Sequence, residues 1–168
     1  LNAFSEKLIL YQDANYAKSY RKIMDAISAQ FGDTIISQKS AKALFRAMAI
    51  KDEYEVARLM LSPTFEQTLK SKFGNSRPSS YYLAPPFLSF LKDANGFPKK
   101  VRFGSWVRTV FWVLTKLKSL RGTAFDPFAH SRERKLEVSF RAALIAKLSN
   151  PKKLMQMPEK SEAQLDAA

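Results

Sequence analysis

Apolar residues recur at helical spacing through the first third of the chain. Between Asp13 and Gly32 they lie three or four positions apart, which places them on one face of a helix. They are Tyr16, Tyr20, Ile23, Ile27 and Phe31. Asp13 has the side chain of an N-cap, and Gly32 stands where helices commonly end. The pattern therefore predicts an amphipathic helix over residues 13–31.

A second apolar stripe runs from residue 39 to Pro63. Its members are Leu44, Phe45, Met48, Val56, Leu59 and Met60. The stripe is ended by the proline, so the pattern predicts one long helix before it. Ser62 and Pro63 also have the form of an N-cap followed by a first-turn proline. They predict a further short helix, which Gly74 closes.

The pattern changes between residues 78 and 103, where four prolines exclude a long helix. They are Pro78, Pro85, Pro86 and Pro98. Aromatic residues alternate with other residues around Asn95-Gly96, a dipeptide that favours a tight turn between extended arms. We expect an extended connector rich in proline and aromatic residues, or one irregular hairpin, rather than a larger sheet.

Two more helices are predicted in the second half of the chain. Residues 104–121 carry so many apolar side chains that we expect this helix to be buried on more than one side. Residues 131–149 place a set of apolar residues on one side, before Asn150-Pro151 ends the helix. That set is Leu136, Phe140, Ala143, Leu144 and Leu148. The predicted fold class is mainly α. About five helices and the connector form one domain over residues 1–150, and residues 151–168 form a short or frayed tail.

Charge separates one block of the chain from the rest. The 168 residues carry a formal charge of +13, and residues 99–153 hold 14 Lys and Arg against 3 Asp and Glu. A field of this sign attracts nucleic acid, anionic lipid, acidic proteins or phosphorylated ligands. The candidates for an anion-binding or partner-binding face are Lys99, Lys100, Arg102, Lys116, Lys118, Arg121, Arg132, Arg134 and Lys135. A solvated charged surface without a ligand is the alternative interpretation.

The turn between the last two predicted helices lies in the middle of this block. Gly122 suits the position just after a helix, and Asp126-Pro127 suits an N-cap with a first-turn proline or a type I turn. A turn alone explains these residues, but it does not explain the cations on both sides. If the two helix ends meet, those cations share a surface with the free N–H groups that begin the next helix.

Asp52 lies four residues from both Met48 and Val56, on the apolar side of the long predicted helix. A carboxylate there needs a partner, because burying it unpaired costs free energy. We expect Asp52 or its neighbour Glu53 to form an internal ion pair with an arginine of the basic block, Arg121 or Arg134. A catalytic role is not favoured, since no nucleophile, metal-ligand set or phosphate-binding glycine loop accompanies these carboxylates.

The residue inventory narrows the chemistry further. The chain has no cysteine, which excludes disulfides, thiolate zinc sites and iron–sulfur ligation by this chain. With a single histidine, His130, we expect no metal site and interpret that residue as an ordinary polar side chain. No apolar run reaches the roughly 18 residues of a membrane span. The chain starts at Leu1 without a signal-peptide pattern, so we expect a soluble, cytoplasmic fragment of a longer protein.

Several strings, in this order and spacing, resemble one known family. They are KDEYEVARL, LAPPFL, GFPKKVRFGSW and KLKSLRGTAFDPF followed by RERKLE. The similarity spans about residues 10–148 and resembles the domain near the C-terminal end of indolepyruvate:ferredoxin oxidoreductases and related fused 2-oxoacid:ferredoxin oxidoreductases. The chain departs from the family pattern at Ala129 and His130, where glycine and tyrosine are more usual.

The resemblance implies a parent enzyme that decarboxylates a 2-oxoacid, forms an acyl-coenzyme A and reduces ferredoxin. Thiamine diphosphate, Mg²⁺ and iron–sulfur clusters would sit in other domains of that parent, and the family assigns no catalytic residue to this one. The expected role is a non-catalytic accessory domain. Its partners would be the parent's other domains or subunits, with ferredoxin or coenzyme A meeting the basic face.

Two other interpretations remain. A basic helical module that binds nucleic acid fits the charge and the aromatic residues between cations, although no recognised binding motif is present. A helix at residues 104–121 lying on a membrane surface fits less well, because its apolar arc is too wide and suits a core.

Overall fold

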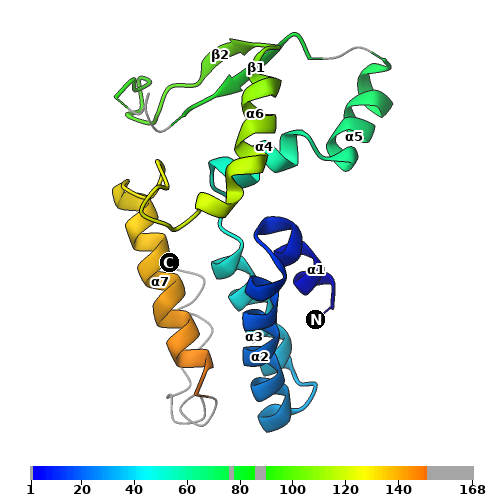
Figure 1. Cartoon of the computed structure of the whole chain (residues 1–168), viewed down its shortest axis with the longest axis vertical. Helices are drawn as coiled ribbons and strands as arrows, with labels where there is room; N and C mark the ends of the chain where they lie inside the picture. The colour runs from blue at the N-terminus through cyan, green and yellow to red at the C-terminus, as the bar shows by residue number, and fades with distance from the viewer. Residues whose placement is uncertain (1, 76–77, 86–89, 151–168) are drawn as a thin grey trace. The chain divides into compact units, whose positions relative to one another are not determined.

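The computed structural model describes residues 2–75, 78–85 and 90–150, and the predicted tail at 151–168 lies outside this range. The described residues are mainly helical, with a single two-stranded sheet, so the predicted fold class is confirmed. The chain divides into two compact units, residues 1–49 with 138–168 and residues 50–137. Figure 1 shows the elements of both. The single domain predicted for residues 1–150 stays a prediction.

The first unit is built on α1 (Asn2–Tyr11), α2 (Ala14–Phe31) and α3 (Ile35–Met48). Helix α2 begins as the sequence predicts: the Asp13 carboxylate accepts a hydrogen bond from the Tyr16 amide at 2.8 Å, and Gly32 ends the helix at φ 65°. The core of this unit is formed by Leu8, Ala17, Tyr20, Met24, Ile27, Ala41, Leu44, Met48 and Leu148. The last of these comes from α7 (Arg132–Leu148), whose residues from Val138 onward belong to this unit.

The long helix predicted for residues 39–62 is wrong: the structure has two helices there. Helix α3 ends at Met48, and α4 (Glu53–Met60) begins after the N-cap Asp52, whose backbone is extended at ψ −178°. The four-residue spacing of Met48, Asp52 and Val56 continues across the break, so periodicity could not reveal it. Asp52 therefore begins a helix and is not on the apolar side of one.

The second unit contains α4, α5 (Pro63–Phe73), β1 (Ser80–Leu83), β2 (Val101–Gly104), α6 (Val107–Lys116) and the 3₁₀ helix η2 (Leu117–Leu120). The two strands pair antiparallel, with Ser80 opposite Gly104, which is the irregular hairpin that the prolines and Asn95-Gly96 predict. At its turn the Asp93 carboxylate accepts hydrogen bonds from the Asn95 and Phe97 amides, and Gly96 has φ 81°.

The prediction that the helix at 104–121 is buried on more than one side is wrong. Only Val107 and Phe111 of α6 are buried, in a small core with Ala57 of α4 and Tyr81 of β1. Because α4 packs on one side of α6, side chains on another side reach solvent. On α7 the predicted apolar residues also separate: Leu148 is buried, whereas Leu136 and Phe140 are exposed. None of the described helices combines the length and apolar character that crossing a bilayer requires.

Candidate functional site

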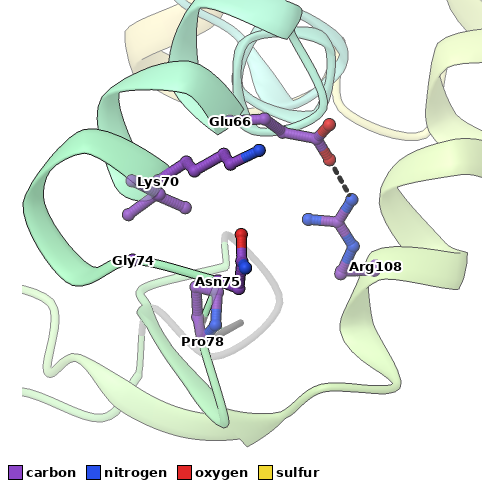
Figure 2. A pocket seen from close by; sticks show the side chains of 7 residues that line it. Glu66, Lys70, Gly74, Asn75, Pro78 and Arg108 are labelled. Carbon is purple, nitrogen blue, oxygen red and sulfur yellow. Dashed lines mark hydrogen bonds and ion pairs between the residues drawn. The ribbon is translucent and has the colours of Figure 1, made fainter.

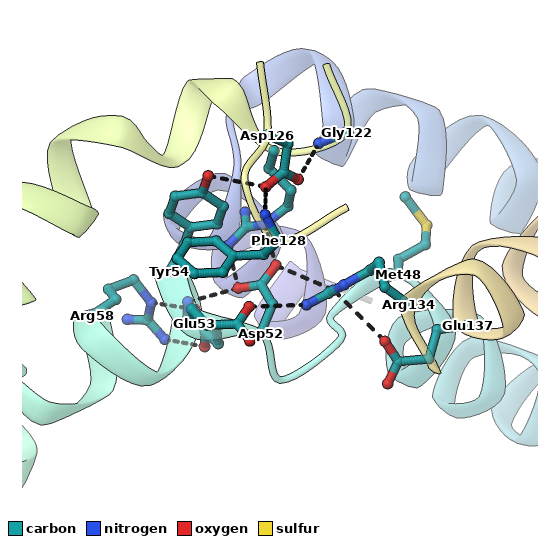
Figure 3. A network of polar contacts seen from close by, with 12 residues as sticks. Met48, Asp52, Glu53, Tyr54, Arg58, Gly122, Asp126, Phe128, Arg134 and Glu137 are labelled. Carbon is teal, nitrogen blue, oxygen red and sulfur yellow. Dashed lines mark hydrogen bonds and ion pairs between the residues drawn. The ribbon is translucent and has the colours of Figure 1, made fainter. Parts of the chain in front are cut away.

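The Asp52 carboxylate is the centre of a buried polar network in the second unit, drawn in Figure 3. Its side chain is 1% exposed and accepts two hydrogen bonds from Arg121, one from Nε and one from Nη2 at 2.9 Å. The same carboxylate accepts a bond from the Glu55 amide at 2.8 Å, which caps α4. Arg134 Nη1 lies 3.5 Å away. One side chain therefore starts a helix and neutralises arginines from a distant part of the chain.

Glu53 extends the network at its edge. Its Oε2 accepts a hydrogen bond from Arg134 Nη2 at 3.3 Å, and the same arginine lies 3.7 Å from Glu137. Burial raises the pKa of Glu53, and the charge of Arg134 opposes that rise in part. The structure thus brings Asp52 and Glu53 together with Arg121 and Arg134, the residues considered for an ion pair from the sequence.

Asp126 is the second buried carboxylate, and its contacts explain the glycine and aspartate of the turn. It accepts hydrogen bonds from the Gly122 amide at 2.8 Å, the Phe128 amide at 3.0 Å and the Tyr54 hydroxyl at 3.1 Å. Gly122 has φ 74°, a conformation that suits glycine. Burial, and then the nearby Asp126 charge, raise the pKa of Tyr54. The Asp126 carboxylate therefore holds the turn together through hydrogen bonds to two of its backbone amides.

Sequence reasoning missed the Tyr54–Asp126 bond, which joins residues 72 positions apart. The Arg121 guanidinium lies over the Tyr54 ring, 5.4 Å from its centroid. The Phe128 ring packs edge-on against the Tyr54 ring, with 5.3 Å between their centroids. The only hint of this contact in the sequence was the position of Tyr54 among the acidic residues Glu53 and Glu55 in a basic chain. These contacts join the start of α4 to the turn after η2.

The nine basic candidates differ in their exposure and partners. Arg121 and Arg134 lie in the network, and Lys118 is half-buried. The six exposed members are Lys99, Lys100, Arg102, Lys116, Arg132 and Lys135. The start of α7 is capped internally, since Ser131 Oγ accepts a hydrogen bond from the Arg134 amide at 3.1 Å. His130 is exposed beside it.

An apolar cavity of about 560 Å³ lies in the same unit. Hairpin residues, one side of α6, the start of α4 and Phe128 line it. Its lining includes Lys51, Asp52, Glu53, Phe103, Trp106 and Val110. A cavity of this volume with mainly apolar walls and a few polar groups is the usual form of a binding site.

A second, smaller pocket of about 350 Å³ is polar and lies between α5 and α6 (Figure 2). Arg108 points toward Glu66 and forms an ion pair with it, and the guanidinium also donates to the Tyr81 hydroxyl at 3.4 Å. These two hydrogen bonds raise the pKa of Arg108, with the Tyr81 bond as the larger cause. Lys70 and Asn75 complete the wall. Its arginine is thus already partnered.

Within the described parts of the chain, no three histidine, cysteine, aspartate or glutamate side chains gather as metal ligands would. A family model described as "Family of unknown function (DUF6537)" matches residues 2–151. No curated protein and no solved structure matches the chain.

Proposed function

We propose that this chain, which belongs to the DUF6537 family, is a non-catalytic accessory domain of a thiamine-diphosphate-dependent 2-oxoacid:ferredoxin oxidoreductase of the indolepyruvate type. The resemblance of its long motifs to the domain near the C-terminal end of such enzymes supports this assignment. On this proposal the domain contributes a docking surface, and the chemistry takes place in the parent's other domains.

The observation that carries the docking role is the sorting of charge in the second unit. Its buried arginines are matched by carboxylates, so Arg121 and Arg134 stabilise the fold. The exposed cations form a separate set, and they supply an external positive field. Such a field attracts an acidic protein such as ferredoxin, or the phosphates of coenzyme A, and mainly raises the association rate.

The residues present do not fit the parent's cofactors. Iron–sulfur clusters are held by cysteine thiolates, and the chain has none. Mg²⁺, which would accompany thiamine diphosphate, needs accessible oxygen ligands, whereas the buried Asp52 and Asp126 already accept hydrogen bonds within the fold. On this proposal, other domains of the parent enzyme bind these groups.

The test replaces four exposed cations of the basic block by glutamate in the parent oxidoreductase: Lys99, Lys100, Arg132 and Lys135. The rate of ferredoxin reduction at low ionic strength should fall about tenfold, and the difference should disappear as salt screens the field. Turnover with a small neutral electron acceptor should stay unchanged.

A matched control makes the same change of charge on exposed lysines of the first unit: Lys7, Lys18, Lys22 and Lys39. This variant should reduce ferredoxin at a rate close to that of the parent. Equal effects of the two variants would mean that net charge, and not this block, sets the rate. No effect of either variant at any ionic strength would remove the docking role.

A further inference from the structure

Helix α6 carries two apolar stripes, and only one of them is covered. Val107, Phe111 and Leu114 face the small core. The other stripe is at i, i+4, i+7 and i+11, which is also helical spacing. It begins at Trp106, the N-cap of α6, and ends at Leu117, the first residue of η2. Its members Trp106, Val110, Val113 and Leu117 have exposed fractions of 60%, 40%, 42% and 40%. Single exposed apolar residues are common, but four aligned along a helix form a surface of the kind that partners bind.

This stripe is continuous with the apolar cavity. Trp106 and Val110 belong to both, and the hairpin side chain Phe103 lies against Trp106 with ring centroids 5.9 Å apart. The cavity therefore forms a groove along α6 from Trp106 to Leu114, with the hairpin as its other wall, and the rest of the stripe continues beside it. A groove of this form suits an amphipathic helix that places apolar side chains at i, i+3 or i+4 and i+7.

The charged residues at the groove indicate the charge of the partner that would bind there. Both carboxylates in its lining, Asp52 and Glu53, are paired with Arg134. Lys51, in the lining, is exposed just before the N-cap of α4. Lys116 is exposed three residues beyond Val113, near the end of the stripe. The carboxylates of the lining are thus neutralised, whereas these two lysines reach solvent and favour a partner of negative charge.

The same charge disfavours a second copy of the chain as the occupant. Each copy carries a formal charge of +13, so two copies docked through this face would bring like charges together. An acidic partner, in contrast, brings carboxylates near Lys51 and Lys116 while the partner's apolar side chains are buried in the groove.

We propose that this groove, with the exposed stripe of α6, is the binding site for an acidic amphipathic helix of a partner protein. The inference rests on the proposed docking function and adds the chemistry of the segment that is docked. The segment presents apolar residues along one side and carboxylates on its flanks, opposite Lys51 and Lys116.

The test uses three synthetic peptides and the 168-residue chain. The acidic peptide has about 15 residues, with Leu at i, i+4, i+7 and i+11 and Glu and Ala elsewhere. The basic peptide has Lys in place of each Glu, and a scrambled acidic peptide keeps the composition but loses the apolar stripe. In a Trp112→Phe background the remaining tryptophan is Trp106, which lies in the groove and reports binding by its fluorescence.

We expect the acidic peptide to bind saturably and shift the Trp106 emission to the blue, while the other two bind at least about tenfold more weakly. Val110→Asp with Val113→Asp should weaken binding of the acidic peptide at least about tenfold. Lys51→Glu with Lys116→Glu should weaken it several-fold and reduce its salt dependence. The matched control is Tyr82→Asp with Phe97→Asp, which places two carboxylates on exposed aromatic positions of the same unit. It should bind as the parent does.

Three results would overturn the proposal. They are equal binding of the acidic and basic peptides, no effect of the α6 variant beyond that of its control, and self-association that the α6 variant abolishes in sedimentation. Failure of the proposed function gives a different result: the rate of ferredoxin reduction stays the same when the exposed cations of the basic block are replaced. Peptide binding that depends on Val110 and Val113 would leave this inference standing in that case.

Discussion

Asp52→Asn is the substitution from which the structure predicts the largest loss of stability for the smallest change of shape. Asparagine keeps the capping bond to the Glu55 amide but removes the negative charge that faces Arg121 and Arg134. Removing one partner of a buried pair costs about 3–5 kcal/mol, because the remaining charge stays buried. Asp52→Ala also loses the cap and should cost about 1 kcal/mol more.

The assay is urea unfolding at pH 7, followed by tryptophan fluorescence. Both tryptophans of the chain, Trp106 and Trp112, lie in the second unit, so the signal reports the part that contains the network. The matched control is Glu55→Gln, which breaks the partly exposed pair with Arg58 one turn along the same helix. It should cost only about 0.5 kcal/mol.

A double-mutant cycle with Arg121→Met tests whether the loss belongs to the pair. Replacing both partners removes the unpaired charge, so the double variant should be more stable than the sum of the single losses predicts, by about 1–3 kcal/mol. A loss below about 1 kcal/mol for Asp52→Asn, or strictly additive losses, would refute the reasoning, because a solvated pair behaves in that way.

Three further predictions concern pH and the turn. Burial raises the pKa of Tyr20 to about 12, so its hydroxyl stabilises the fold below pH 10.0 and that contribution is lost as the pH rises toward 12. Tyr20→Phe should therefore lose less stability over that interval, by up to about 3 kcal/mol, in urea unfolding followed by circular dichroism. Burial also raises the pKa of Glu53, so the contribution of its protonated form is present below the ordinary value of 4.5 and is lost as the pH rises through the raised pKa. Glu53→Gln should lose less stability than the parent as the pH rises from about 4 toward neutrality, and a parallel pH dependence in the two proteins would contradict this. Gly122→Ala should cost about 1–2 kcal/mol because φ is 74°, although a Cβ there meets no atom within 4 Å; an unchanged urea midpoint would show that the turn relaxes.

The local signals in the sequence predicted most of the helix ends. Asp13 and Gly32 bound α2, and Ser62, Pro63 and Gly74 bound α5, because caps and first-turn prolines act within three or four residues. The hairpin followed from its prolines and turn residues for the same reason. Helix α1 was not predicted, because its apolar residues do not gather clearly on one face.

The contacts that depend on the tertiary fold were harder to predict. Periodicity shows that a side of α6 is apolar, but not whether another element covers it, so the exposure of Val110 and Val113 had no signal. The pairing of Asp52 with an arginine followed from the cost of burying a carboxylate, whereas the bond between Tyr54 and Asp126 required the chain path to be known. Of the nine cations, the sequence singled out Arg121 and Arg134 as candidates for the internal ion pair, but it could not show how exposed the other seven are.

The double use of Asp52 has a consequence for the order of folding. Its cap on α4 spans three residues and can form as soon as that helix nucleates, whereas its pairing with Arg121 requires a loop of 69 positions to close. During folding, the Asp52 carboxylate therefore stays hydrated until Arg121 pairs with it. Because a contact that closes a loop of this length is expected to form late, loss of the Asp52 charge should speed unfolding more than it slows refolding.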